Sequence, residues 1–310
     1  MDVSDTQPGK CGKDWMSQLP RHLQTVPLNK LAIPGSHNSF SYSLDPLSQV
    51  APDQPREIQA VVHMFGAPGR DVIHRWSVTQ TLTVEQQLNS GIRYFDIRIS
   101  RHTGSGKVCF IHGLHGADVI PCLEDMKKFL SNHPKEIVIL DFNHLYEMEA
   151  GHHASLLQAI TEIFGNKICP FLNMECLTLE MLWESELQVI ILYHNEAVSE
   201  NPFFWSGSFI KSPYTNSTDI SHLLSFLDKH KKENDDPERF FCWQGILTPC
   251  AQTIISHFSG SLKDVLASKL APFFVTWVKN GKSINCKHGI FIMDFVEMAD
   301  FISCVIDLNY

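Results

Sequence analysis

Short runs of apolar residues recur along the chain, separated by polar segments and by glycine or proline. These runs lack the alternation of apolar and polar positions that marks a strand with one face in solvent. They are typical of strands buried on both faces, as in a parallel sheet. The pattern predicts strands around residues 31–33, 92–97, 108–111, 137–142, 189–193, 240–243 and 289–295.

The segments between these runs repeat apolar residues with the period of a helix. The clearest is Ser155–Phe164, with apolar side chains on one stripe and Gly165 placed as a C-cap. Further helices are predicted over 123–130, 220–227 and 254–270, and the proline-bearing stretch 45–70 predicts a long excursion. Strands that alternate with helices indicate an α/β fold with a mainly parallel sheet. An eighth strand near Phe209 and Ile210 would close a barrel; an open doubly wound sheet is the alternative.

Polar or ionisable residues end most of the apolar runs. The active sites of α/β barrels are built from residues at the carboxyl ends of the strands, which all lie on one face of the barrel. If all the strands are parallel, these residues converge on that face. They include His37, Asn38, Asp96, Arg98, His112, Asn143, His194, Gln244 and Asp294.

Such a set of side chains suits displacement at a phosphodiester. Two histidines supply one base and one acid near neutral pH. An arginine binds phosphate oxygens in a bidentate fork and stabilises the charge that develops on them. An aspartate that faces a histidine fixes its tautomer and raises its basicity.

Composition and charge narrow the classes of partner. The chain has 310 residues, 44% of them hydrophobic, with 25 Lys and Arg against 34 Asp and Glu. A net charge of −9 disfavours a nucleic-acid binder, so an anionic ligand must be held by a few placed groups. Nine scattered cysteines without a C-x-x-C pair fit a reducing compartment. No signal peptide or transmembrane stretch is visible, which favours the cytoplasm, with the nucleus as an alternative.

Three motifs resemble a known family. Residues 33–39 read IPGSHNS, residues 91–98 read GIRYFDIR, and residues 110–113 read FIHG. Their order and spacing are similar to the X domain of phosphatidylinositol-specific phospholipase C, most of all to small eukaryotic proteins that have only an X domain. The similarity runs from about Asp14 to Tyr310, with residues 1–13 as a short polar tail. It implies a single-domain, irregular (β/α) TIM-type barrel.

The resemblance also implies a role for each of the catalytic candidates. His37 would be the general base, and His112 the general acid that protonates the leaving diacylglycerol oxygen. Arg98 would stabilise the charge on the phosphorus. Asp294 would pair with His37, and Asp96 matches the acidic position of the second motif.

Two departures from the family bear on metal use. The calcium-dependent members carry an acidic ligand where this chain has Arg98, whose charge would repel the ion. Asn38 matches a calcium ligand of that group, where the metal-independent bacterial enzymes have an aspartate that supports the acid histidine. Since a calcium site takes about six to eight oxygens, one candidate ligand does not make one, and calcium is disfavoured. Asn38 is expected to hydrogen-bond to His112 without supplying charge. No cofactor is expected.

The family resemblance also implies contacts with the substrate and with a membrane. Asn143, Tyr193 and Gln244 end strands where the head-group contacts of the family fall. The expected partner is a phosphoinositide lipid, reached by transient membrane contact through loops at the barrel mouth. Phe203, Phe204 and Trp205, which lie together in one predicted loop, are candidates for that contact.

Two other functions stay open at this point. A metal-dependent phosphodiesterase for glycerophosphodiesters would need a cluster of carboxylates, for which Asp96, Asp141 and Asp294 are the candidates. A catalytically weak module that binds a phospholipid or a protein would keep the same residues without their working geometry.

Overall fold

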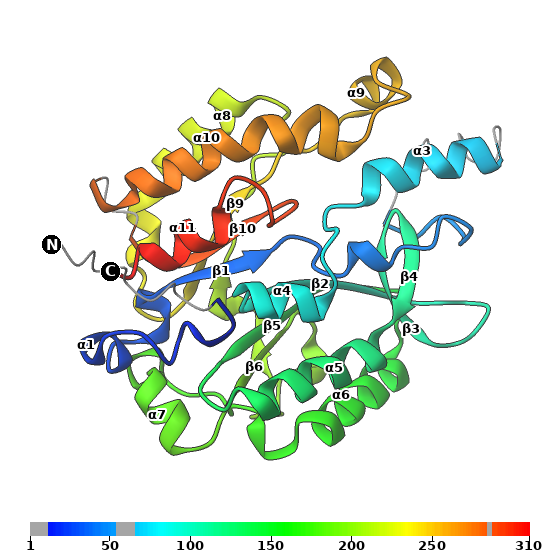
Figure 1. The fold of residues 1–310 in the computed structure, drawn as a ribbon. Helices are drawn as coiled ribbons and strands as arrows, with labels where there is room; N and C mark the ends of the chain where they lie inside the picture. Colours follow the sequence, from blue (N-terminus) through cyan, green and yellow to red (C-terminus); the bar gives the residue numbers. More distant parts are fainter. Residues whose placement is uncertain (1–11, 54–65, 284–286) are drawn as a thin grey trace, which may run out of the picture.

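A curled, mostly parallel sheet forms the centre of the molecule, described here from a computed structural model of residues 12–53, 66–283 and 287–310 (Figure 1). Each neighbouring pair along its main path is parallel. The path runs β7 (Trp205–Ser206), β6 (Val189–Tyr193), β5 (Val138–Tyr146), β2 (Tyr94–Arg101), β1 (Ala32–Ser36), β10 (Gly289–Met293), β9 (Phe240–Gly245) and β8 (Ile210–Lys211). In these ranges no pairing joins β7 to β8, so the barrel stays open there. The prediction of an irregular α/β barrel is confirmed, and β8 is the predicted eighth strand.

One predicted strand runs the opposite way. β3 (Val108–His112) pairs antiparallel with β2, and β4 (Leu114–Asp118) pairs antiparallel with β3. The expectation that the strand ending at His112 belongs to the parallel set is therefore wrong. β2 continues well past Asp96 and Arg98, and the chain turns back through β3, so His112 returns to the level of Arg98.

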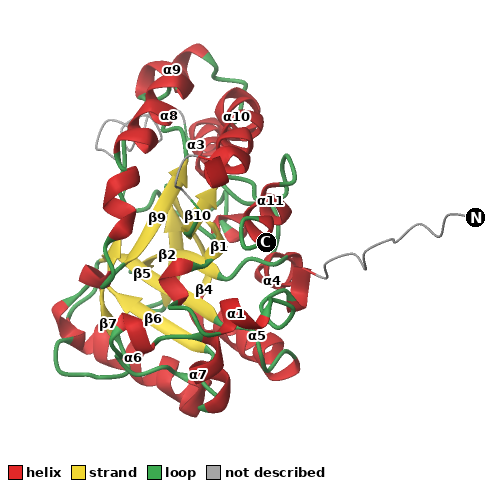
Figure 2. Cartoon of the chain, turned by 90° about the vertical axis from the view of Figure 1, so that its left-hand side faces the viewer, coloured by secondary structure: helices red, strands yellow, loops and turns green. Residues whose placement is uncertain are grey.

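Helices cover the outer face of the sheet on both sides (Figures 1 and 2). On one side lie α5, α6 and α7; on the other lie α8, α10 and α11. Their bounds, with those of the shorter helices, are α1 (Arg21–Gln24), α3 (Ala67–Ser77), α4 (Val84–Ser90), α5 (Val119–Asn132), α6 (Ala150–Phe164), α7 (Leu179–Glu184), α8 (Ile220–Lys229), α9 (Ala251–Ser256), α10 (Ser268–Lys279) and α11 (Phe301–Asp307).

The predicted helix over 254–270 is wrong in its bounds. The chain forms α9, breaks, passes through a π-helical turn at Lys263–Ala267 and then enters α10. A break fits the sequence, because Gly260 interrupts the apolar pattern and Ser261 caps the next turn by accepting from the Asp264 N–H.

Local sequence signals explain how the chain enters β2. Thr83 and Gln86 form a capping box at the start of α4. Gly91 ends that helix with φ of +116°, a conformation that glycine adopts without strain. The following residues of β2 are then aligned beside β1, with Gly35 opposite Tyr94.

Two predicted segments fall partly outside the described residues. Residues 1–11 of the predicted tail and residues 54–65 of the predicted excursion are among them. The backbone of Lys13, by contrast, is bound to the fold, because its carbonyl accepts a hydrogen bond from Arg93 at 2.8 Å. Within the described ranges, no helix is long and apolar enough to cross a membrane.

Candidate active site

A cavity of about 1480 Å³ opens where the parallel strands end. Its polar side chains come from the loop after β1, from β2, β3 and β5, and from the ends of β6, β9 and β10. Its apolar wall comes from α3 and from the segment around α9. The ionisable residues that line it are His37, Tyr94, Asp96, Arg98, His112, Asp141, His144, His194, Tyr214, Cys250 and Asp294.

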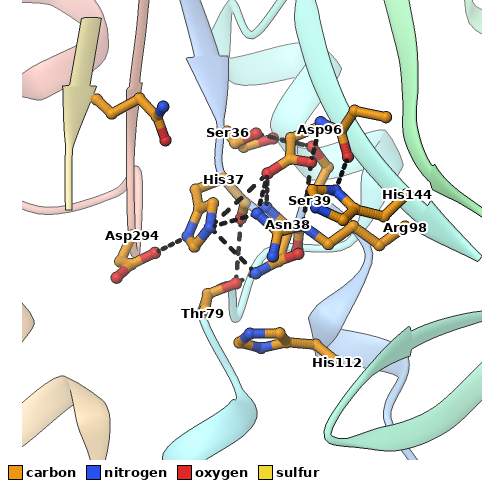
Figure 3. Close-up of polar contacts among 12 residues, drawn as sticks. Ser36, His37, Asn38, Ser39, Thr79, Asp96, Arg98, His112, His144 and Asp294 are labelled. Atoms are coloured by element: carbon orange, nitrogen blue, oxygen red, sulfur yellow. Dashed lines mark hydrogen bonds and ion pairs between the residues drawn. The ribbon is translucent and has the colours of Figure 1, made fainter. Parts of the chain in front are cut away.

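His37 and Asp294 form a buried pair at the ends of neighbouring strands. His37 directly follows β1 and Asp294 directly follows β10. The two strands pair in register, with Ser36 opposite Met293. His37 Nδ1 lies 2.6 Å from Asp294 Oδ1, as Figure 3 shows. This contact sets the ring orientation and places the hydrogen on Nδ1.

The other ring nitrogen of His37 meets two hydrogen-bond donors. The Nη2 of Arg98 lies 3.0 Å from His37 Nε2, and the side-chain amide nitrogen of Asn38 lies 3.2 Å from it. Because a guanidinium can only donate, Nε2 must present its lone pair. His37 therefore has the tautomer of a base, with the lone pair of Nε2 on the side of Arg98 and Asn38.

Unusual backbone angles follow both members of this pair. Asn38 has φ of +42° and Phe295 has φ of +53°. Asparagine tolerates this region, whereas a phenylalanine held there is strained. Gln80 fixes both turns, because its amide donates to the carbonyls of His37 (3.0 Å) and Met293 (2.9 Å). Thr79 Oγ1 also donates to the His37 carbonyl, at 3.1 Å.

Asp96 and Arg98 lie on the same face of β2, two residues apart. Asp96 Oδ2 accepts from Arg98 Nη2 at 3.2 Å and from the Asn38 backbone N–H at 2.9 Å. Its Oδ1 accepts from the Asn143 side chain at 2.7 Å. Burial alone would raise the pKa of Asp96, but Arg98, His37 and these donors hold it below its ordinary value. Asp96 is thus an ionised support that orients the guanidinium.

His112 faces the same space from the opposite wall. Its ring centroid lies 6.2 Å from that of His37, with the rings nearly perpendicular. Its Nδ1 lies 2.6 Å from the Ser77 carbonyl oxygen, which can only accept. The hydrogen on Nδ1 is thereby fixed, and Nε2 is the atom that gains and loses a proton. Burial and the nearby Arg98 lower the pKa of His112 below its ordinary value.

Asn38 does not contact His112 as expected. Its side-chain nitrogen meets His37 instead, and its buried Oδ1 has no hydrogen-bond partner among the described residues. The carboxylate that acts on His112 comes from Asp53, which sequence reasoning missed. Asp53 accepts the Gly113 N–H with both oxygens, at 3.1 and 3.0 Å. Its charge raises the pKa of His112 against the effects of burial and Arg98.

Two of the three predicted head-group residues line the cavity. Asn143 sits at a bulge, where the β2–β5 register skips one residue of β5, and its amide is committed to Asp96 and to His144. Gln244 lines the wall, its amide nitrogen donating to Ser212 and Pro213.

Tyr193 is the exception. It is fully buried outside the cavity, and its hydroxyl bonds to His153 Nδ1 at 2.7 Å. The next residue, His194, lines the cavity in its place.

The donor set does not suit a calcium ion beside Asp96. Both oxygens of Asp96 are taken by internal donors, and the Arg98 cation occupies the adjacent position. Asp294 is bound to His37, and Asp141 to Tyr94 and His194. In the described part of the chain, no three His, Cys, Asp or Glu side chains form a metal-binding group.

The fold and the arrangement of the site define a class of protein. The structure matches a phosphatidylinositol-specific phospholipase C from Listeria monocytogenes with a TM-score of 0.65 and 20% identity, over 97% of this chain and 99% of that one. It matches a variant phosphatidylinositol-specific phospholipase C from Staphylococcus aureus with a TM-score of 0.66 and 17% identity, over 97% of both chains. At these identities the likeness shows the fold: the irregular α/β barrel of those proteins.

Similarity in sequence identifies the family. The human PI-PLC X domain-containing protein 3 is 40% identical over 299 residues, covering 96% of this chain and 93% of its own. The mouse PI-PLC X domain-containing protein 2 is 43% identical over 302 residues, covering 96% and 88%. No family model matches. The chain belongs to the family of PI-PLC X domain-containing proteins.

Proposed function

We propose that this protein is a phosphoric diester hydrolase that cleaves phosphatidylinositol-type lipids into diacylglycerol and inositol phosphate, without a metal. The observation that carries the proposal is that Arg98 contacts His37 at the Nε2 atom that can take a proton, while His112 faces the same space with its own Nε2 able to give one. Arg98 Nη2 lies 3.0 Å from His37 Nε2, and His112 faces the same space. The names of the relatives and the fold of the structural neighbours support the substrate class.

The first step is an attack within the substrate. His37 Nε2 takes the proton from the inositol hydroxyl next to the phosphate, and that oxygen forms a bond to phosphorus. The bond from phosphorus to the glycerol oxygen breaks, and His112 Nε2 gives its proton to that oxygen. Diacylglycerol leaves, and a cyclic inositol phosphate remains. Water then opens the ring with the two histidines in reversed roles.

The charged neighbours have supporting roles in this scheme. Arg98 stabilises the charge on the phosphoryl oxygens, as preorganised cations do in phosphoryl transfer. Asp294 stabilises the His37 imidazolium that forms during the step. Asp96 keeps the guanidinium in place through its contacts with Arg98.

The test is release of water-soluble inositol phosphate from phosphatidylinositol vesicles, with excess EDTA and, separately, with added calcium. Equal activity in both conditions supports the proposal. Activity only with calcium would overturn the metal-independent part of it. Inactivity in both, across several inositides, would favour a binding module or another phosphodiester substrate.

Asp53 offers a test through pH. We expect Asp53→Asn to lower the pKa of His112 further, because its charge is lost while Asn can still accept the Gly113 N–H. His112 must be protonated to act as the acid, so the alkaline limb of the kcat/KM profile should move to lower pH. The measurement is the pH profile of both enzymes on one substrate. An unchanged alkaline limb would show that Asp53 does not act on the acid.

Exposed apolar side chains at the cavity mouth suit contact with a lipid surface. Ile255 and Phe258 are 69% and 52% exposed and line the cavity. α3 and the segment after α9 meet across the mouth, since Arg75 Nη2 donates to the Phe258 carbonyl at 3.0 Å. Figure 1 shows both helices on the side toward which β1 points. Membrane binding has been studied for the Staphylococcus aureus enzyme of the same fold. Of the aromatic loop residues expected to reach the membrane, Phe203 is 47% exposed, but Phe204 and Trp205 are buried, so the expectation is wrong for these two.

The membrane face can be mapped by substitution. We expect Ile255→Ser with Phe258→Ser to weaken binding to phosphatidylinositol vesicles by at least about tenfold, because each buried apolar side chain contributes about 1.5–3 kcal/mol. Phe273→Ser is the matched control, since Phe273 is 55% exposed on α10 and does not line the cavity. Vesicle co-sedimentation measures both. Equal loss in the two variants would place the contact elsewhere.

A further inference from the structure

A second histidine–aspartate pair lies in the cavity and has no part in the reaction above. His194, just past β6, places Nε2 at 2.8 Å from Asp141 Oδ1 on β5. Asp141 Oδ2 accepts a hydrogen bond from the Tyr94 hydroxyl at 2.6 Å. Asp141 and Tyr94 are about 1% exposed, whereas the His194 side chain is 31% exposed and lines the cavity.

The cavity has few cations to offer an anionic head group. Arg98 is the one arginine or lysine among the described residues that line it, and it is paired with Asp96. A phosphate on the inositol ring would need a further positive charge. Among the other described residues that line the cavity, His194 is the histidine that pairs with a buried carboxylate and has no role in the proposed reaction.

The contact with Asp141 decides which nitrogen of His194 titrates. An ionised carboxylate only accepts, so Nε2 carries its hydrogen in both charge states and Nδ1 is the atom that changes. Neutral His194 presents a lone pair at Nδ1, which accepts a hydrogen bond from a ring hydroxyl. Protonated His194 presents an N–H and a positive charge, which suit a phosphate oxygen.

We propose that His194, positioned by Asp141, is the residue at which this cavity distinguishes a free inositol hydroxyl from a ring phosphate, through its protonation state. The inference rests on the proposed function and deepens it. The ligand is a phosphatidylinositol monophosphate, which the cavity should prefer to phosphatidylinositol at lower pH, where His194 is protonated.

The charged groups around His194 favour its protonated form. The titratable groups that face it are Asp141 and His144 of β5, and Asp96 and Tyr94 of β2. The turn Gly207–Phe209 contributes no titratable side chain; a Cβ at Gly207 would collide with the imidazole, so the ring packs on that backbone. Burial alone would lower the pKa of His194, but Asp141 and then Asp96 raise it above its ordinary value.

The experiment compares phosphatidylinositol with its monophosphates on one enzyme. Phosphatidylcholine vesicles contain phosphatidylinositol or, in turn, each of its three monophosphates, and kcat/KM is measured from pH 5.5 to 8.5. Dividing kcat/KM for a monophosphate by kcat/KM for phosphatidylinositol removes the pH dependence that His37 and His112 impose equally on both substrates. For at least one monophosphate the ratio should fall as pH rises, by up to about tenfold per unit above the pKa of His194.

His194→Gln is the matched variant, because glutamine keeps a donor and an acceptor but does not titrate. At acid pH, the ratio of kcat/KM values for His194→Gln should be lower than that of the wild type. Its remaining pH dependence should come only from the second ionisation of the substrate phosphate, near pH 6, which affects both enzymes equally. Asp141→Asn should move the wild-type transition to lower pH. Superimposable ratio profiles for wild type and His194→Gln would overturn the proposal.

A binding measurement separates this proposal from the proposed function. Calorimetry with inositol 1-phosphate and with inositol bisphosphates gives the same ratio without turnover. If the wild type hydrolyses none of the lipids, the proposed function fails. A pH-dependent preference for a bisphosphate that is lost in His194→Gln would then still support the role of His194, and its absence would overturn that role.

Discussion

Replacing His37 with alanine is expected to lower kcat/KM for phosphatidylinositol by about 10²- to 10⁴-fold, the contribution of a positioned general base. Asp294→Asn should cause a loss of similar size, because an amide at 2.6 Å from Nδ1 no longer stabilises the imidazolium and favours the wrong tautomer. The double variant should be little worse than either single one, since the two residues act as a unit.

Folding must be separated from catalysis in these variants. His37 and Asp294 are both buried, so circular dichroism and thermal unfolding accompany each assay. His222→Ala is the matched control, because His222 is exposed on α8, on the outer side of the sheet. Retention of more than a tenth of the activity by His37→Ala would remove His37 from the role of base.

Breaking the buried ion pair at the opposite end of the sheet is expected to destabilise the fold by about 3–5 kcal/mol. Arg93 and Glu136 are fully buried, with Arg93 Nε 2.9 Å and Nη2 2.7 Å from Glu136 Oε2. The same guanidinium donates to the carbonyls of Leu88, Ile92 and Lys13. Glu136→Gln leaves the Arg93 charge buried without its counter-charge. Urea unfolding should show a lower midpoint with an unchanged slope.

Two further variants show whether the buried position is the cause. Glu233→Gln removes the partner of Lys211 at the surface, where both side chains are about 40% exposed, and should change stability by less than about 1 kcal/mol. Arg93→Met with Glu136→Leu should recover only part of the loss, because the carbonyls of Leu88, Ile92 and Lys13 then lose the hydrogen bonds that Arg93 donates. Equal midpoints for Glu136→Gln and Glu233→Gln would contradict the prediction.

The strand pattern was accessible from sequence because it depends on local chemistry. Apolar runs located β1, β2, β3, β5, β6, β9 and β10, whose residues are mostly buried. β4 and β7 were missed, since one contains His115, Gly116 and Asp118 and the other has only two residues. The direction of β3 is set by pairing with β2, which no local pattern encodes.

The end of β6 shows how a shift of one position along a strand changes which side chain reaches the cavity. Successive side chains of a strand point to opposite faces, so a shift of one residue exchanges the helix side for the cavity. Tyr193 points to α6 and bonds to His153, whereas His194 reaches the cavity. The apolar run ends at Tyr193 and gives no sign of which of the two residues faces inward.

Other site residues carried no signal in the sequence at all. Gln80 fixes the turns that hold His37 and Asp294, and it lies far from Asp294 along the chain. Asp53 acts on His112 from a segment with no motif. Their roles depend on contacts between segments that only folding brings together.

The sequence by itself determined the class of fold and the family, and it singled out two histidines and an arginine as catalytic candidates, because short motifs with fixed spacing contain them. It also placed two arginines in one motif, five residues apart, without distinguishing their roles. Only the tertiary structure decided that Arg93 is buried in an ion pair while Arg98 faces the cavity. It also decided which nitrogen of His37 and of His112 keeps its hydrogen and which one can exchange a proton. The physical reason is that burial, tautomer and pKa depend on partners distant in sequence, whose positions are set by the pairing and curl of the whole sheet.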